Sequence, residues 1–154
     1  MSQDDVGTAL TLVTLLCAAR LVWVDFRQFE IEPPTLAVMA GTLLLQAGLT
    51  APAAEVLIRL VSALAFYGAV VFLTRTVRGL SRVGAGDPPL IGVVAFMVFP
   101  LLVPWSLMAA LLILITAASY ARVRGKRVLR SMFPAAPPLL GAAVPVYLLV
   151  TLGG

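Results

Sequence analysis

Six apolar segments, separated by short polar or proline-containing connections, follow one another along the chain. They cover residues 6–24, 34–49, 53–74, 88–103, 104–121 and 135–152. A membrane-spanning helix needs about 20 mostly apolar residues, and irregular backbone cannot face lipid. The pattern therefore predicts an all-α, polytopic membrane protein, in which a bundle of about six transmembrane helices forms a single domain over residues 1–154.

The fourth and fifth segments adjoin, and Pro100 and Pro104 lie at their junction. Proline lacks a backbone N–H and disfavours the helical conformation of the residue before it. We therefore predict a tight turn between two separate spans here. A single re-entrant element is the alternative.

Composition strengthens the membrane interpretation. Hydrophobic residues make up 61% of the chain and charged residues 12%, and the mean hydropathy is +1.05. Soluble domains contain about 45–50% apolar and about 25% charged residues, so lipid must solvate most of this surface. Cys17 is the single cysteine and histidine is absent. We therefore expect no internal disulfide, no metal site and no cofactor.

The basic residues alternate between connections. Every Lys and Arg except Arg59 lies in or flanks the first, third or fifth connection: Arg20, Arg27, Arg75, Arg78, Arg82, Arg122, Arg124, Lys126, Arg127 and Arg130. Positive residues favour the cytoplasmic side of a membrane. We predict that these connections face the cytoplasm from the inner membrane, with both termini outside. This topology accounts for the net charge of +4, and we expect no nucleic-acid binding.

Two aspartates lie at the boundary between a span and a cytoplasmic connection. Asp25 ends the first apolar segment and Asp87 opens the fourth, whereas we expect Glu30 and Glu32 to be solvated loop charges. Carboxylates close to hydrocarbon are costly and are usually functional. Structural roles are also open, because Asp87 can start a helix ahead of two prolines, and Asp25 can pair with nearby arginines (Arg20 or Arg27).

Two carboxylates held close together suit acid–base hydrolysis. Both cannot easily ionise, so one can activate water while the other protonates a carbonyl, as in aspartic proteases. The absence of histidine argues against a histidine-assisted serine or cysteine nucleophile. Gly84 and Gly86, just before Asp87, would let a substrate strand approach closely, or they simply punctuate a loop.

The motifs around both aspartates resemble those of the type IV prepilin peptidases. "DFRQFEI" at 25–31 and "GAGD" at 84–87 are similar to the two aspartate motifs of that family, and "FPAAPPLLGAAV" at 133–144 is similar to the proline-rich start of its last span. The resemblance implies that Asp25 and Asp87 are catalytic, supported by Gly84, Gly86 and Arg27. It implies removal of a leader peptide from prepilin-like or secretion-subunit precursors on the cytoplasmic side, beside pilus or secretion machinery. The compact chain lacks the cysteine-bearing segment of larger members, so we expect no methyl transfer.

Two departures from the family pattern keep other functions open. Pro89 replaces the lysine that usually follows the second aspartate by two places, and Glu32 precedes Pro33 in the continuation of the first motif. One alternative is a catalytically silent assembly factor of a pilus or secretion system. Another is a small proton-coupled transporter, although the chain shows no paired halves and its acids lie at the boundary.

Overall fold

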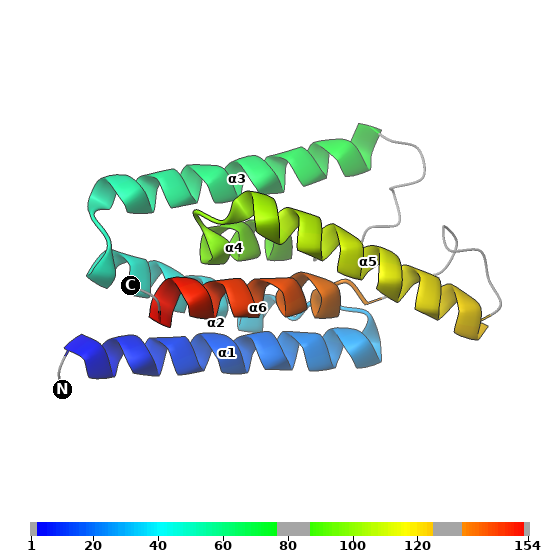
Figure 1. The fold of residues 1–154 in the computed structure, drawn as a ribbon, viewed down its shortest axis with the longest axis horizontal. Helices are drawn as coiled ribbons and strands as arrows, with labels where there is room; N and C mark the ends of the chain where they lie inside the picture. The colour runs from blue at the N-terminus through cyan, green and yellow to red at the C-terminus, as the bar shows by residue number, and fades with distance from the viewer. Residues whose placement is uncertain (1–2, 77–86, 125–133, 153–154) are drawn as a thin grey trace.

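The computed structural model describes residues 3–76, 87–124 and 134–152, and Figure 1 shows their arrangement. These residues form six helices: α1 (Gln3–Gln28), α2 (Pro33–Thr50), α3 (Ala53–Thr76), α4 (Asp87–Val98), α5 (Leu102–Arg124) and α6 (Ala136–Leu152). The expected fold class, an all-helical bundle of six helices, is confirmed for this part of the chain.

Successive helices run in opposite directions through the bundle. The carboxyl ends of α1, α3 and α5 and the amino ends of α2, α4 and α6 lie at one end, at the right of Figure 1. Connections as short as residues 29–32 and 51–52 require neighbouring helices to be antiparallel. We name the end that contains Asp25 and Asp87 the Asp25 end, and the opposite one the α2–α3 end.

Within the described part of the chain, three helices are long and apolar enough to cross a membrane, namely residues Asp5–Gln28, Ala53–Thr76 and Leu102–Ser119. Helices α4 and α6 are shorter. The 12 residues of α4 extend only about 18 Å, against a hydrocarbon core of about 30 Å. The predicted fourth span, 88–103, extends five residues beyond the end of α4 at Val98, because the chain turns at 99–101.

The turn between α4 and α5 confirms two separate helices but moves their boundary. It contains Pro100, preceded by a cis peptide bond from Phe99. Helix α5 begins at Leu102, so Pro104 lies in its first turn and not in the connection. Proline is tolerated there, since the first N–H groups of a helix have no partner inside the helix.

The outward faces of the long helices are apolar. In α3, Ala63 is the only buried residue, while Leu57, Leu64 and Phe72 are exposed. Helix α5 likewise exposes large side chains such as Leu107. Contiguous apolar surface of this extent is rare on soluble monomers and marks contact with lipid or protein. Such exposed apolar helices indicate a membrane protein.

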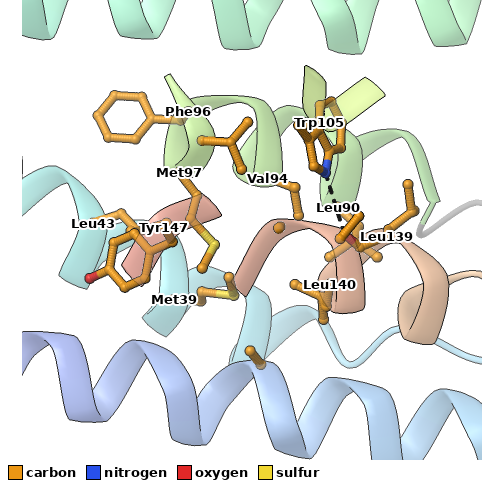
Figure 2. Packing of buried hydrophobic residues seen from close by; sticks show 14 of the residues in the cluster. Met39, Leu43, Leu90, Val94, Phe96, Met97, Trp105, Leu139, Leu140 and Tyr147 are labelled. Carbon is orange, nitrogen blue, oxygen red and sulfur yellow. Dashed lines mark hydrogen bonds between the residues drawn. The ribbon is translucent and has the colours of Figure 1, made fainter. Parts of the chain in front are cut away.

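Helix α4 forms the centre of the core. It packs against α2, α3, α5 and α6, and most of its side chains are buried. Figure 2 shows Leu90, Val94 and Met97 of α4 within the buried cluster that includes Leu140 of α6. Buried Trp105 of α5 donates its indole N–H to the Leu139 carbonyl at 3.4 Å, as the dashed line in Figure 2 marks.

Gly92 allows α4 to approach α3 closely. A Cβ atom at this position would lie 3.3 Å from the Tyr67 Cβ and 3.4 Å from the Ala63 carbonyl oxygen. Small residues at helix interfaces bring backbones together in membranes, where packing takes the place of the hydrophobic effect. Gly92 and Ala63 therefore fix α3, whose other residues are not buried, onto the core.

Replacing Gly92 by leucine should separate α3 from α4. We expect Gly92→Leu to lower the free energy of unfolding by about 1–3 kcal/mol, the usual cost of an overpacked contact. Unfolding in mixed micelles of mild detergent and SDS would measure it. Gly141→Leu is the matched control, since a Cβ at Gly141 has no atom within 4 Å. Equal stability of both variants would show that the α3–α4 contact tolerates the extra volume.

Candidate functional site

Asp25 lies in the carboxyl-terminal part of α1, at the level where α6 begins. Among the described residues it is the only charged residue that is buried, with 3% of its surface exposed. Its Oδ2 atom accepts a hydrogen bond of 2.7 Å from the backbone N–H of Ala136. Because α1 packs against α6, this bond joins the first helix of the chain to the last.

The sequence at the start of α6 explains this bond. The first four N–H groups of a helix lack partners within it, but Pro137 and Pro138 have no N–H to satisfy. Leu139 donates its N–H to the Ala135 carbonyl at 3.3 Å. Ala135 and Ala136 are therefore the remaining donors, and the Asp25 carboxylate interacts with the N–H groups of both, most directly with that of Ala136. A carboxylate at this position also interacts favourably with the helix dipole.

The arginines considered as partners of Asp25 bind elsewhere. Arg20 forms an ion pair with Glu32, with Nε 2.7 Å from Oε2 and Nη2 3.0 Å from Oε1. The guanidinium of Arg27 lies 4.3 Å from the ring centre of Trp23. The proposal that Asp25 pairs with either arginine is therefore not what the structure shows. The motif residue Arg27 is exposed and reaches an aromatic side chain of its own helix.

Glu32 is more than a solvated loop charge. Besides its pair with Arg20, it accepts a 2.7 Å hydrogen bond from the Thr35 hydroxyl. The Arg20 and Thr35 donors stabilise the ionised carboxylate and hold the pKa of Glu32 below its usual value. The pair therefore stabilises the α1–α2 connection above the ordinary glutamate pKa, and this contribution is lost as the pH falls through the lowered one. Glu32 therefore has a structural role at the α1–α2 connection.

Asp87 is the first residue of α4, and Pro88 and Pro89 complete the start of the helix. Pro88 is buried, and Asp87 is partly exposed. Asp87 therefore has the helix-starting position that the sequence left open, and the two prolines are well suited to the first turn that follows it. The other two residues expected to support the motif, Gly84 and Gly86, lie outside the described residues.

Asp25 and Asp87 lie on two helices, α1 and α4, that both pack against α6. Helix α6 packs against both α1 and α4, whereas α1 and α4 do not pack against each other along their described residues. Leu90, near the start of α4, and Leu139, near the start of α6, belong to the same buried cluster. The structure therefore brings Asp25 and Asp87 to one end of the bundle, on two helices that both contact α6.

A polar chain that sequence reasoning missed crosses the interior between α1, α2 and α6. The Tyr147 hydroxyl donates to the Gln46 amide oxygen at 2.6 Å, and the Gln46 amide nitrogen donates to Thr11 at 3.2 Å. Nearby, the hydroxyls of Thr14 and Thr42 lie 3.0 Å apart. The available signal was Gln46 itself, the one amide inside the second apolar segment.

An apolar groove and a polar cavity lie between the described helices, and neither of these is lined by Asp25 or Asp87. An apolar groove of about 330 Å³ between α2, α3 and α4 is lined by Ala40, Leu43, Leu44, Leu60, Ala63, Leu64, Tyr67, Pro89, Gly92, Val93 and Phe96. A polar cavity of about 540 Å³ at the α2–α3 end is lined by Leu43, Gln46, Ala47, Thr50, Ala51, Glu55, Arg59, Phe96, Met97, Tyr147, Val150 and Thr151. Pro89, two residues after Asp87, thus contributes apolar surface to the groove.

No protein-family model, curated protein or solved structure matches this chain. Its function must therefore be inferred from the residues and their geometry. Among the described residues, no group of three or more His, Cys, Asp and Glu side chains could hold a metal ion. The chemistry that the described site offers is that of carboxylates at the edge of an apolar bundle.

Removing the acceptor at position 25 should loosen α6. We expect Asp25→Ala to lower the free energy of unfolding by about 1–3 kcal/mol, because the Ala136 N–H stays buried without a partner. Asp25→Asn should lower the free energy of unfolding by less, since its amide oxygen can still accept the hydrogen bond, although without the charge. Unfolding in mixed micelles would measure both, with Glu30→Ala, an exposed acid near the same end, as the control. An equal loss in the alanine and asparagine variants would mean that the charge, and not the acceptor, stabilises α6.

Proposed function

We propose that this protein is an aspartic endopeptidase of the prepilin-peptidase type, which removes the leader peptide of prepilin-like or secretion-subunit precursors. The observation that carries the proposal is the placement of the two motif aspartates at one end of the bundle, on helices that both pack against α6. The burial of Asp25 adds support, because a carboxylate is rarely placed inside a membrane protein without a function.

The proposed reaction needs two carboxylates and one water molecule. One carboxylate takes a proton from the water, which attacks the carbonyl carbon of the scissile peptide bond. The other carboxylic acid protonates the carbonyl oxygen, and the resulting intermediate collapses as the leaving amine is protonated. Asp25 and Asp87 fill these roles as a pair, and neither a metal ion nor a cofactor takes part.

Water must reach Asp25 for this reaction to occur. The carboxylate is shielded in the present structure and is bound to the Ala136 N–H. In the proposed mechanism, substrate binding draws the first turn of α6 away from Asp25, which exposes the carboxylate toward Asp87. Catalytic hydrogen bonds are commonly looser in the free enzyme and tighten when substrate binds.

The charges of the described helices support an orientation in the inner membrane in which the Asp25 end faces the cytoplasm. The described basic residues Arg20, Arg27, Arg75 and Arg122 belong to α1, α3 and α5, toward their carboxyl ends. Arg59, near the other end of α3, is paired with Glu55. Cytoplasmic loops of membrane proteins carry the excess of Lys and Arg. Basic leaders would be repelled by this end, so apolar and backbone contacts must provide recognition.

A second function is favoured by the bond between Asp25 and Ala136. This bond gives the buried carboxylate a structural purpose that requires no catalysis. Glu32, a departure from the family motif, is likewise explained by its pair with Arg20. The second candidate is therefore a catalytically silent relative that serves as an assembly factor of a pilus or secretion system.

Catalysis by the pair predicts the loss of cleavage in either asparagine variant. Asp25→Asn and Asp87→Asn should each abolish leader removal, because an amide can neither act as the base nor share the proton. The double variant should be no worse, since residues that act as one unit do not add. The measurement is co-expression with prepilin-like proteins from the same genome, followed by the mobility shift of the cleaved product. A chelator should not affect the reaction.

Glu30→Gln is the matched control, since it neutralises an exposed carboxylate near the same end of α1. It should retain full cleavage. Persistent cleavage in both asparagine variants would rule out the pair. If the unmodified, folded protein cleaves none of the candidate precursors, the assembly-factor function takes its place.

The proposed orientation predicts which positions an impermeant thiol reagent reaches. In a Cys17→Ala background, Ala53→Cys at the start of α3 should react in intact cells. Arg75→Cys at the end of the same helix should react only after lysis. Both positions are exposed, so accessibility within the protein does not bias the comparison. Labelling of position 75 from outside would reverse the topology and place the aspartates on the wrong side.

A further inference from the structure

We propose that the polar cavity and the apolar groove together bind one phospholipid whose headgroup carries a primary amine. Arg59 would bind the phosphate, Glu55 the ammonium group, and the groove an acyl chain. The two cavities are adjoining, because Leu43 and Phe96 line both of them. Since neither is lined by Asp25 or Asp87, this inference does not depend on the proposed peptidase function.

The polar cavity holds an ion pair in which Arg59 is mostly shielded and Glu55 is about a third exposed. The Arg59 side chain is 18% exposed, and that of Glu55 is 37% exposed. Charged groups near hydrocarbon usually line a binding site or pathway or pair with each other. Here they form a pair, and hydroxyl and amide groups of Gln46, Thr50 and Thr151 also line the cavity. The cavity therefore offers an ion pair and uncharged hydrogen-bonding groups side by side.

The ion pair leaves hydrogen-bonding capacity unused. Nε and Nη2 of Arg59 both bond to Oε1 of Glu55, at 3.1 Å and 2.5 Å. Among the described residues, the Nη1 donors of Arg59 and Oε2 of Glu55 have no hydrogen-bond partner. A guanidinium binds phosphate oxygens well, and a carboxylate accepts from an ammonium group. Adjacent free donors and a free acceptor therefore match a zwitterionic phosphoethanolamine headgroup.

The position of the groove matches the acyl chain of the same molecule. On α3, Glu55 and Arg59 line the polar cavity. Toward the middle of the helix, the groove is lined by Leu60, Ala63, Leu64 and Tyr67. The stretch from Glu55 to Tyr67 is about 18 Å long at about 1.5 Å per residue. This length is close to one leaflet, half of a hydrocarbon core of about 30 Å plus a headgroup. Polarity thus changes along the site as it does along a phospholipid.

Other occupants fit less of the site. A water-soluble zwitterion would leave the apolar groove without a purpose, and an anionic lipid without an amine would leave Glu55 unmatched. An apolar helix from another protein would fill the groove but not the polar cavity. Volumes of about 330 and 540 Å³ both fall within the range of about 300–1,000 Å³ that is common for ligand pockets.

The test is lipid binding by the delipidated protein in detergent, followed by native mass spectrometry. Phosphatidylethanolamine, phosphatidylcholine and phosphatidylglycerol would be titrated separately, together with glycerophosphoethanolamine, which has the headgroup without chains. We expect phosphatidylethanolamine to bind at least tenfold more tightly than the other two lipids. Glycerophosphoethanolamine should bind at least tenfold more weakly than the complete lipid.

Variants separate the two charges. Arg59→Gln should weaken phosphatidylethanolamine binding about tenfold, because the phosphate loses its cation. Glu55→Gln should remove the preference over phosphatidylcholine while leaving the binding of phosphatidylcholine unchanged. Ala40→Trp, which fills part of the groove, should weaken the binding of all three lipids to the same extent. This variant leaves the ion pair unchanged. Arg75→Gln is the control, since it removes an exposed cation from the other end of α3.

Three results would overturn the proposal. Equal affinity for all three lipids would indicate unselective surface lipid. Equal affinity for glycerophosphoethanolamine and its lipid would indicate a site for a soluble ligand. If a folded Glu55→Gln variant still prefers phosphatidylethanolamine over phosphatidylcholine, the carboxylate does not recognise the amine. The thermal midpoint of each variant in detergent establishes that it is folded before its affinity is compared.

Discussion

Lipid offers no hydrogen-bond partners, so each polar group inside this bundle must be satisfied by another part of the protein. The bond from Ala136 to Asp25 is the clearest case, because it satisfies a backbone N–H at the start of α6 with a carboxylate from α1. Among the described residues, no buried side-chain nitrogen or oxygen lacks a hydrogen-bond partner. The same requirement explains the polar chain from Tyr147 through Gln46 to Thr11.

These polar contacts complement the apolar packing in holding the helices together. Helix–helix association in lipid gains little from the hydrophobic effect and depends on close packing and hydrogen bonds between helices. The polar chain and the Asp25 bond join α6 to α1 and α2, while Gly92 and Ala63 bring α4 against α3. Helix α4, too short to span the bilayer, lies at the centre of these contacts. Its amino end, with Asp87, is therefore held at the same end of the bundle as Asp25.

The position of Asp25 has consequences for any chemistry at this end. If Asp25 also activates water, one of its oxygens must be reachable by water while Oδ2 accepts from the Ala136 N–H. In the proposed peptidase, the shielded carboxylate would become accessible when a substrate displaces the first turn of α6. In a silent relative, the same bond would simply hold the last helix in place. The position of α6 and the proposed chemistry would thus depend on the same carboxylate.

Much of the architecture follows from the sequence because the thickness of the bilayer and the absence of water set simple rules. The predicted segment 34–49 corresponds to Pro33–Thr50, and 135–152 to Ala136–Leu152. The α4–α5 boundary was misplaced, because a proline inside the first turn of a helix and a proline in a connection look the same in sequence. Motif spacing likewise identified Asp25 and Asp87 as candidates without indicating what surrounds them.

Only the tertiary structure decided which groups meet. Asp25 and Ala136 lie far apart along the chain, and no local pattern distinguishes a bond to the α6 amide from an ion pair with Arg20 or Arg27. The pairing of Glu32 with Arg20, and the cavity that joins Gln46 and Tyr147 to Arg59, also require helices brought together by folding. Hydropathy and charge act along the chain and are readable from it. Hydrogen bonds between helices depend on rotation and depth, which packing alone sets.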